Sequence, residues 1–256
     1  MNSGKIAFIV RAARYSPGAT DKDLAILTAV RQQLAGDGFV CLAPVSEERL
    51  PDLPEADAYV SMARSQPVLD LLAARQAAGR LVVNGVPAVM LCGYRSLLMH
   101  TLQHEGVSVP PTHGDGSYWV KRGFGWRETA SDVQQVPDYS AAVALRDSLL
   151  AGGAAAVDVR RHVEGDWVKF YAVRQTDFFY ACHPAGQRYA FSADALRQMT
   201  ARAAACVSGL DVYGGDCIVR PDGEAVLVDL NDWPSFSPCR EQAARAIAEH
   251  IRGRMS

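Results

Sequence analysis

Three oxygen-bearing side chains near the C-terminal end of the sequence have the types and spacing of a divalent-metal site. Asp229 and Asn231 are two residues apart in the strand-like segment EAVLVDLN, so their side chains should point to the same face. Asp216 belongs to the preceding strand-like segment, DVYGGDCIV, where an unpaired carboxylate would be costly to bury. Two carboxylates and an amide oxygen suit Mg²⁺, or Mn²⁺ in its place. The pattern predicts a metal site; the alternative is a hairpin end whose acids are merely hydrated.

The turn between these two segments decides whether the carboxylates converge. A two-residue turn at Asp222-Gly223 sets one register for the hairpin. In that register the facing pairs are Asp216 with Asp229, Ile218 with Leu227, and Pro221 with Glu224. A four-residue loop keeps this register, whereas a three-residue turn with a bulge shifts it by one and turns Asp229 to the other face. We therefore expect a turn with an even number of residues.

The composition narrows the classes of protein and partner. The 256 residues include 26 Lys and Arg against 28 Asp and Glu, for a net charge of −2. This charge provides no electrostatic surface for nucleic acid or an anionic membrane, and no segment approaches the roughly 18 apolar residues of a membrane span. The six cysteines are widely scattered, without a C-x-x-C pair. We expect a cytoplasmic protein whose partners are small molecules, with a homodimer as the default assembly.

The elements that must position these residues change in character along the chain. Within residues 1–84, which we expect to form an N-terminal domain, strand-like and helix-like segments alternate, and this alternation predicts a small parallel sheet covered by helices. The expected strands are 5–10, 38–42, 57–62 and 80–84, and the expected helices are 21–35 and 67–78.

From residue 118 onwards, strand-like runs follow one another with little helix between them, which predicts a mostly antiparallel sheet. The expected strands are 117–122, 155–163, 166–173, 177–183, 211–219 and 224–231, and the expected helices are 139–150, 193–207 and 240–251. We expect a central unit over residues 85–155 and a C-terminal unit with the metal site over residues 156–256. The whole chain is predicted to be α/β, with an α+β C-terminal half.

The C-terminal segments resemble a known superfamily. G-L-D-x-x-G-x-D, a hairpin, and then V-L-V-D-x-N-x-x-P-S-F closely resemble the end of the ATP-grasp enzymes, and the likeness covers most of the chain. The resemblance implies an ATP-grasp architecture, in which a small parallel N-terminal sheet is followed by two subdomains that sandwich ATP. It also implies that Asp216, Asp229 and Asn231 hold Mg²⁺ against the phosphates of the nucleotide.

An upstream segment is similar to the part of these enzymes that binds adenosine. VDVRRHVEGDWVKFYAV resembles the hinge that holds adenine by main-chain hydrogen bonds before the chain turns at a glycine. By this resemblance the hinge comprises Arg161, His162 and Val163. Glu164 is expected to bind the ribose hydroxyls.

Three basic residues match positions that contact phosphate in the superfamily. YWVKRG resembles the strand whose lysine reaches the nucleotide phosphates, which makes Lys121 the candidate for that role. Lys169 matches a basic position that faces phosphate or an acyl-phosphate. Arg95 stands at a helix start where the superfamily usually has a lysine, and arginine keeps the charge but not the geometry.

Two departures from the superfamily pattern bear on the chemistry. The glycine-rich loop over the phosphates is reduced to Gly123-Phe124-Gly125-Trp126. Gly214 replaces the arginine that many of these ligases place two residues before the first metal acid. Lys169 or Arg174 is therefore expected to act in catalysis by supplying charge to an acyl-phosphate.

Three polar residues outside the nucleotide segments are candidates for substrate contact. Arg64 follows a predicted strand, and strand ends in open parallel sheets commonly line ligand crevices. A surface arginine that caps a loop is the alternative. Ser235 and Arg240 follow the metal strand, and their polar groups need partners.

The resemblance implies an ATP- and Mg²⁺-dependent ligase. A small-molecule carboxylate would attack the γ-phosphate to give an acyl-phosphate, and an amine or similar nucleophile would then displace phosphate. Arg95, Lys121 and Lys169 would position the phosphates, so catalysis would be mostly electrostatics and alignment. Two alternatives stay open: a small-molecule kinase, favoured by the missing arginine, and a nucleotide-binding module with little turnover, favoured by the short loop.

Overall fold

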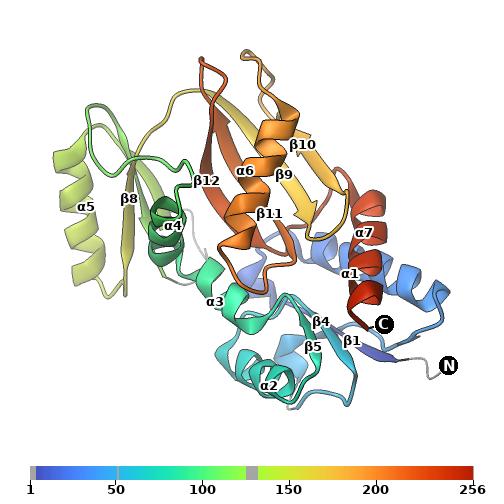
Figure 1. Ribbon diagram of the computed structural model, residues 1–256. Coiled ribbons are helices and arrows are strands. Elements are labelled where there is room, and N and C mark those ends of the chain that lie inside the picture. The colour runs from blue at the N-terminus through green and yellow to red at the C-terminus, as the bar shows by residue number, and fades with distance from the viewer. Residues whose placement is uncertain (1–3, 51, 125–131, 256) are drawn as a thin grey trace.

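The computed structural model describes residues 4–50, 52–124 and 132–255. Of the predicted glycine-rich loop, Gly125 and Trp126 lie outside these residues. Within the described ranges, no helix is long and apolar enough to cross a membrane. The strands form a parallel sheet and two antiparallel sheets, and Figure 1 shows helices packed around them.

The first sheet is parallel and holds the N-terminal part of the chain. Its order is β2-β1-β4-β5, with β3 paired to β1. The strands are β1 (Lys5–Val10), β2 (Val40–Cys41), β3 (Val45–Ser46), β4 (Ala58–Ser61) and β5 (Leu81–Val83), the helices are α1 (Thr20–Gly36) and α2 (Gln66–Ala77), and short 3₁₀ helices lie at Ala13–Tyr15 and Glu47–Arg49. Strands buried on both faces read as continuous apolar runs. The predicted parallel sheet is confirmed.

The second sheet is small, antiparallel and covered by helix α5 (Tyr139–Ala151). Its strands are β6 (Tyr118–Arg122), β7 (Val133–Val136) and β8 (Val157–Arg161), in the order β7-β6-β8. Helix α5 begins after Asp138, whose carboxylate accepts a hydrogen bond from the Ala141 amide at 2.8 Å. A separate core of Tyr118, Val120 and Ala142 holds this unit together. Helices α3 (Val86–Gly93) and α4 (Arg95–His104) lie between the first two sheets in the chain.

The third sheet is antiparallel and carries the predicted metal residues. Its strands are β9 (Asp166–Val173), β10 (Phe179–Cys182), β11 (Val212–Val219) and β12 (Ala225–Asp232), in the order β10-β9-β11-β12. Helices α4 and α6 (Ala193–Ala205) share one apolar core with this sheet, and α7 (Arg240–Met255) shares another. The predicted antiparallel sheet in the C-terminal half is confirmed.

One core joins the two ends of the sequence. Ile6 and Phe8 from β1, Val30 from α1 and Ile247 from α7 are buried in the same apolar cluster, which also takes in Val173 from β9. Helices α1 and α7 pack against each other, and Figure 1 shows the red C-terminal helix beside the blue α1. The first and third sheets are therefore held together by α7.

The β11–β12 hairpin differs from the predicted register near its turn. The Arg220 amide donates to the Glu224 carbonyl oxygen at 2.9 Å, so the loop between them has three residues and the expected even-numbered turn is wrong. Ile218 faces Val226, where we expected Leu227. Pro221, expected to face Glu224, lies within the loop itself.

A β-bulge at Val228 then corrects the register. Cys217 faces Leu227 but the next residue, Asp216, faces Asp229, so the pairing skips Val228. Leu227 and Leu230 both lie in the core beneath the sheet, which leaves Val228 and Asp229 together on the other side. A bulge places two consecutive residues opposite one partner in this way. Asp216 therefore does face Asp229, by a different route from the predicted one.

Candidate active site

A pocket of about 340 Å³ lies between the second and third sheets. The second sheet contributes Trp119 and Lys121 from β6, and the third contributes Trp167, Asp216 and Val228 among others. Figure 1 shows β8 on one flank of the molecule and β9, β11 and β12 in its centre. A largely apolar cavity with a few convergent charged groups is the usual form of a ligand site.

Asp216 is held by two donors from the neighbouring strand. Trp167 Nε1 donates to Asp216 Oδ1 at 2.7 Å, and Lys169 Nζ donates to the same oxygen at 2.8 Å. Lys169 directly faces Asp216 in the β9–β11 pairing. Within the part of the chain that the structure describes, no hydrogen bond or ion pair reaches Asp216 Oδ2. One oxygen of this carboxylate is engaged, and the other is available to a ligand.

The second carboxylate, Asp229, lies among positive charges. Arg95 Nη2 is 3.7 Å from Asp229 Oδ2, and the Asn231 side chain is near enough to favour the ionised carboxylate. Burial acts to raise the pKa of Asp229, but Arg95, Lys121, Asn231 and Lys169 together outweigh burial, and the pKa lies below its ordinary value. Asp229 is therefore ionised at neutral pH. The three predicted phosphate-binding residues gather around it.

The donor set fits Mg²⁺. Asp216 and Asp229 face each other on adjacent strands, and the Asn231 side chain lies near Asp229, so two carboxylates and an amide lie together. Facing carboxylates repel each other unless a cation lies between them. Among the described residues, no three His, Cys, Asp or Glu side chains cluster as metal ligands do. The protein thus offers fewer than the roughly six oxygen ligands of Mg²⁺ and leaves positions for phosphate and water.

The predicted hinge lines the same pocket as Asp216. Arg161, His162 and Val163 all border it. The Arg161 amide donates to the Pro111 carbonyl oxygen and the His162 amide to that of Ser117, each at 2.8 Å. Of these three amides, only that of Val163 has no partner among the described residues. A base held by the main chain here has the Val163 amide available to it.

Two neighbours shape the hinge. Trp119 Nε1 donates to His162 Nδ1 at 3.1 Å, which assigns the proton of the neutral imidazole to Nε2. At Gly165 a Cβ atom would lie 2.2 Å from the Val219 carbonyl oxygen. Only glycine therefore allows the chain to turn from the hinge into β9.

Glu164 borders a different pocket. It is exposed and lines a neighbouring cavity of about 510 Å³, which shares Arg161, His162 and Val163 with the first. A ribose contact by Glu164, as expected from the resemblance, requires the sugar to extend toward this second cavity.

Arg174 is not brought to the carboxylates. Its Nε is 4.0 Å from Asp211 Oδ1, and its Nη2 donates to the Ala204 carbonyl oxygen at 2.6 Å. At about 3.3 Å per residue, an extended chain carries Asp216 about 16 Å beyond Asp211. Of the two predicted catalytic residues, only Lys169 lies beside Asp216.

Gly214 has no room for the arginine that many ATP-grasp ligases carry there. A Cβ atom would lie 2.6 Å from the Phe170 carbonyl oxygen and 2.9 Å from Pro234 Cγ. Gly214 pairs with Asn231, so its bare backbone lies against a predicted metal ligand. Positive charge at this site comes instead from the three basic residues around Asp229.

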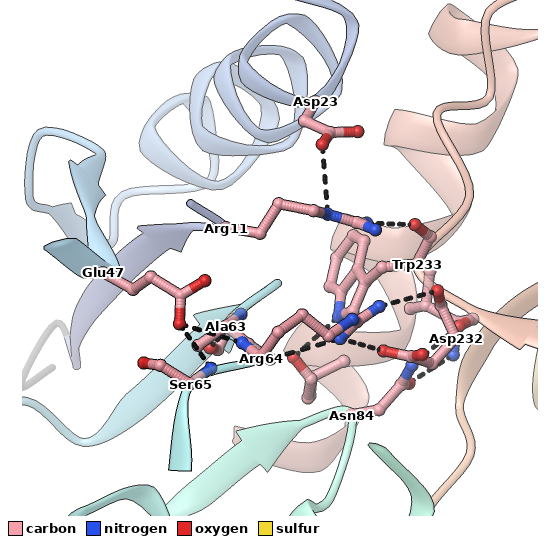
Figure 2. A network of polar contacts seen from close by, with 12 residues as sticks. Arg11, Asp23, Glu47, Ala63, Arg64, Ser65, Asn84, Asp232 and Trp233 are labelled. Atoms are coloured by element: carbon pink, nitrogen blue, oxygen red, sulfur yellow. Dashed lines mark hydrogen bonds and ion pairs between the residues drawn. The ribbon is translucent and has the colours of Figure 1, made fainter. Parts of the chain in front are cut away.

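Arg64 is buried in an ion pair. It is 4% exposed, its Nη1 lies 2.5 Å from Asp232 Oδ2, and its Nη2 donates to the Asp232 carbonyl oxygen at 3.2 Å. Figure 2 shows the guanidinium reaching from the end of β4 to the end of β12, near Arg11, which donates to the Trp233 carbonyl oxygen. Burial and the charge of Arg64 lower the pKa of Arg11 to about 10. The alternative of a surface arginine is wrong, because Arg64 is buried and ties the end of β12 to the first sheet.

Ser235 lies in the loop that follows β12, and Arg240 lies at the end of that loop. Ser235 Oγ is 3.0 Å from Ser237 Oγ. Arg240 begins α7, and its buried Nε atom has no hydrogen-bond partner among the described residues. Trp233 and Phe236 have φ angles of 44° and 52° with buried side chains. Such angles are strained for aromatic residues, so packing of the two rings must hold the loop in shape.

Sequence reasoning missed the two tryptophans of the pocket. Trp119 precedes Lys121 by two residues and Trp167 precedes Lys169 by two. Side chains two apart on a strand share a face. That spacing was the signal that places each indole on the same strand face as a predicted lysine.

Comparisons with known proteins identify the fold. No family model and no curated protein matches this chain. Among solved structures, the VanG D-Ala:D-Ser ligase from Enterococcus faecalis is similar with a TM-score of 0.72 at 13% identity, over 98% of this chain and 99% of that one. A RimK domain ATP-grasp protein from Sphaerobacter thermophilus gives 0.71 at 17% identity, over 97% and 100%. D-alanine–D-alanine ligase from Bacillus anthracis complexed with ATP gives 0.64 at 12%, over 100% of both chains.

These likenesses extend over nearly the whole chain and show that it has the ATP-grasp fold. The predicted ATP-grasp architecture and mixed α/β class are therefore confirmed. Because the identities are low, the activity has to be argued from the site itself.

Proposed function

We propose that this protein is an ATP- and Mg²⁺-dependent ligase that joins a small-molecule carboxylate to an amine. The observation that carries the proposal is the facing pair of Asp216 and Asp229, surrounded by Arg95, Lys121 and Lys169 beside the pocket between the sheets. Two of the similar proteins are named as ligases and one of them holds ATP, which supports the same chemistry here.

The reaction has two steps that need charge balance and alignment. A substrate carboxylate oxygen attacks the γ-phosphorus and breaks its bond to ADP, and an amine nitrogen then attacks the acyl carbon, expels phosphate and loses a proton. Asp216, Asp229 and Asn231 would hold Mg²⁺, which when bound neutralises phosphate charge. Arg95, Lys121 and Lys169 would bind and orient the phosphates.

Among the residues that the structure describes, none beside the carboxylates stands out as a nucleophile. Cys217 follows Asp216 directly but is fully buried, and burial raises the pKa of its thiol far above the ordinary value. A buried neutral thiol does not attack. A mechanism in which the substrate carboxylate is the nucleophile agrees with this arrangement.

A small-molecule kinase is the second candidate. Gly214 leaves no space for the arginine that handles an acyl-phosphate in many ATP-grasp ligases. An enzyme that releases a phosphorylated product and catalyses no condensation would need no such arginine.

Hydroxylamine distinguishes the two candidates, because it converts an acyl-phosphate into a stable hydroxamate. We would incubate the protein with ATP, Mg²⁺, hydroxylamine and a panel of amino acids of both configurations, and measure ADP and hydroxamate. The ligase predicts equal amounts of both with at least one substrate. If ADP and a stable phosphorylated product form without any hydroxamate, the protein is a kinase and the ligase proposal is wrong.

A matched pair of variants ties the activity to the hairpin. Asp229→Asn should lower substrate-dependent ADP release by about 100-fold or more, because the site loses a charged ligand. Asp222→Asn changes an exposed carboxylate in the turn of the same hairpin, where its side chain is 46% exposed, and should leave the rate within about twofold. Equal rates in the two variants would exclude Asp229 from the site.

A further inference from the structure

Trp167 is placed unusually for so large an apolar side chain. It is 40% exposed, although it stands on β9 between the buried residues Asp166 and Val168. Its ring lines the pocket between the sheets, and the Lys169 ammonium lies 5.0 Å from the ring centroid. Burial in a core does not explain this tryptophan, because its ring lies at a pocket wall.

The polar end of the Trp167 ring touches a predicted metal ligand. Trp167 Nε1 donates to Asp216 Oδ1 at 2.7 Å. Lys169 donates to the same oxygen at 2.8 Å, but its charge is also one of those that would bind phosphate. If Lys169 binds a phosphate group, the N–H of Trp167 is the donor that still holds Asp216 Oδ1.

We propose that Trp167 is a positioning residue that links the nucleotide pocket to the metal carboxylate. Its ring forms a wall for the base or ribose, and its N–H fixes the rotation of Asp216 so that Oδ2 is presented toward Asp229. This inference rests on the proposed function, since it assumes a nucleotide in the pocket and a metal at Asp216. Hydrogen bonds to the outer side of a ligating carboxylate commonly change metal affinity by about 10- to 100-fold.

Trp119 provides the matched comparison. It lines the same pocket from the second sheet, but its N–H donates to His162 Nδ1 at 3.1 Å and so holds no carboxylate. Both tryptophans therefore line the pocket, but the N–H of Trp167 donates to Asp216 and that of Trp119 donates to His162.

The test replaces each tryptophan by phenylalanine, which keeps an aromatic wall and removes the N–H. Mn²⁺ is the probe, and its binding to the protein saturated with ADP is measured from the electron paramagnetic resonance signal of free Mn²⁺. ADP binding in EDTA is measured separately by calorimetry. Trp167→Phe should weaken Mn²⁺ binding about tenfold and leave metal-free ADP binding within about twofold. Trp119→Phe should leave Mn²⁺ binding within about twofold.

Two further measurements keep the proposal falsifiable. In the Asp216→Asn background, Trp167→Phe should weaken Mn²⁺ binding no further, because the two residues act as one unit. If the Trp167→Phe variant binds Mn²⁺ as tightly as the wild-type protein does, the proposal is wrong, whether its ADP affinity is unchanged or reduced. The proposed ligase function would not be affected by that result. If the wild-type protein binds no Mn²⁺ in the presence of ADP, the proposed function itself fails.

Discussion

Replacing Arg64 by methionine tests whether this residue ties two sheets together or contacts a substrate. Methionine keeps much of the length of the side chain and removes its charge. It leaves the Asp232 carboxylate, whose side chain is 1% exposed, without the guanidinium 2.5 Å away. Removing one partner of a buried ion pair costs about 3–5 kcal/mol, because the other charge stays buried and uncompensated.

For a domain of this size, each kcal/mol shifts the melting temperature by about 2–4 °C, so the expected loss is about 6–20 °C. The double variant Arg64→Met/Asp232→Leu should recover most of it, since apolar residues often replace a buried pair at little cost. Calorimetry measures the melting temperature and urea unfolding measures the unfolding free energy. The double-mutant cycle gives the coupling free energy between Arg64 and Asp232.

The control is a second arginine–aspartate pair at the surface. Arg80 Nη1 lies 2.8 Å from Asp57 Oδ1, with side chains 44% and 48% exposed. Such pairs contribute about 0–1 kcal/mol, so Arg80→Met should change stability little. Equal losses in Arg64→Met and Arg80→Met, or no recovery in the double variant, would refute the assigned role. A raised KM at unchanged stability would restore Arg64 as a substrate residue.

Two other predictions concern the third sheet. Burial acts to raise the pKa of Asp211, but the hydrogen bond and charge of His250 and two nearby arginines outweigh it and lower the pKa. A carboxylate with a lowered folded pKa stabilises the fold above its unfolded pKa of about 3.9 and loses this effect as pH falls through the folded value. The loss in unfolding free energy on Asp211→Asn should shrink as the pH falls below about 4; a loss that grows as the pH falls below about 4 would contradict the prediction. Deleting Val228 removes only the bulge residue and should preserve cooperative unfolding, whereas deleting Leu230 reverses every face beyond it and should abolish cooperativity; similar melting curves for both deletions would disprove the bulge.

The sheets could be predicted where burial leaves a continuous apolar pattern in the sequence. KIAFIV became β1, and DWVKFYAV became β9 with the predicted bounds. The strand β7 was missed because VQQV is short and half polar, and its residues are partly exposed. A strand with that pattern forms mainly because it pairs with β6, and the sequence of the strand itself does not indicate this pairing.

The facing of Asp216 and Asp229 was predicted, but the prediction relied on the wrong turn. Gly223 has a φ of 84°, the left-handed conformation that glycine provides at the end of a three-residue hairpin loop. That loop shifts the register by one residue, and the bulge at Val228 shifts it back. Because the bulge has no local sequence signature, the two shifts could not be seen to cancel before the structure.

The role of Arg64 lay beyond sequence reasoning for another reason. Its partner Asp232 is far away in the chain and belongs to a different sheet. Spacing rules relate neighbours on one strand or helix, and they carry no information about which ends of two separate sheets meet.

The core shared by β1 and α7 has a consequence for biosynthesis. Ile6 and Phe8 emerge from the ribosome first, whereas Ile247 of the same cluster is made near the end. Translation adds about 5–20 residues per second, so the apolar face of the first sheet stays exposed for more than about ten seconds before α7 is made. Contacts between such distant residues also close slowly. The nascent chain therefore exposes an apolar surface until α7 is synthesised. We expect chaperones to bind the N-terminal half during synthesis and so prevent aggregation.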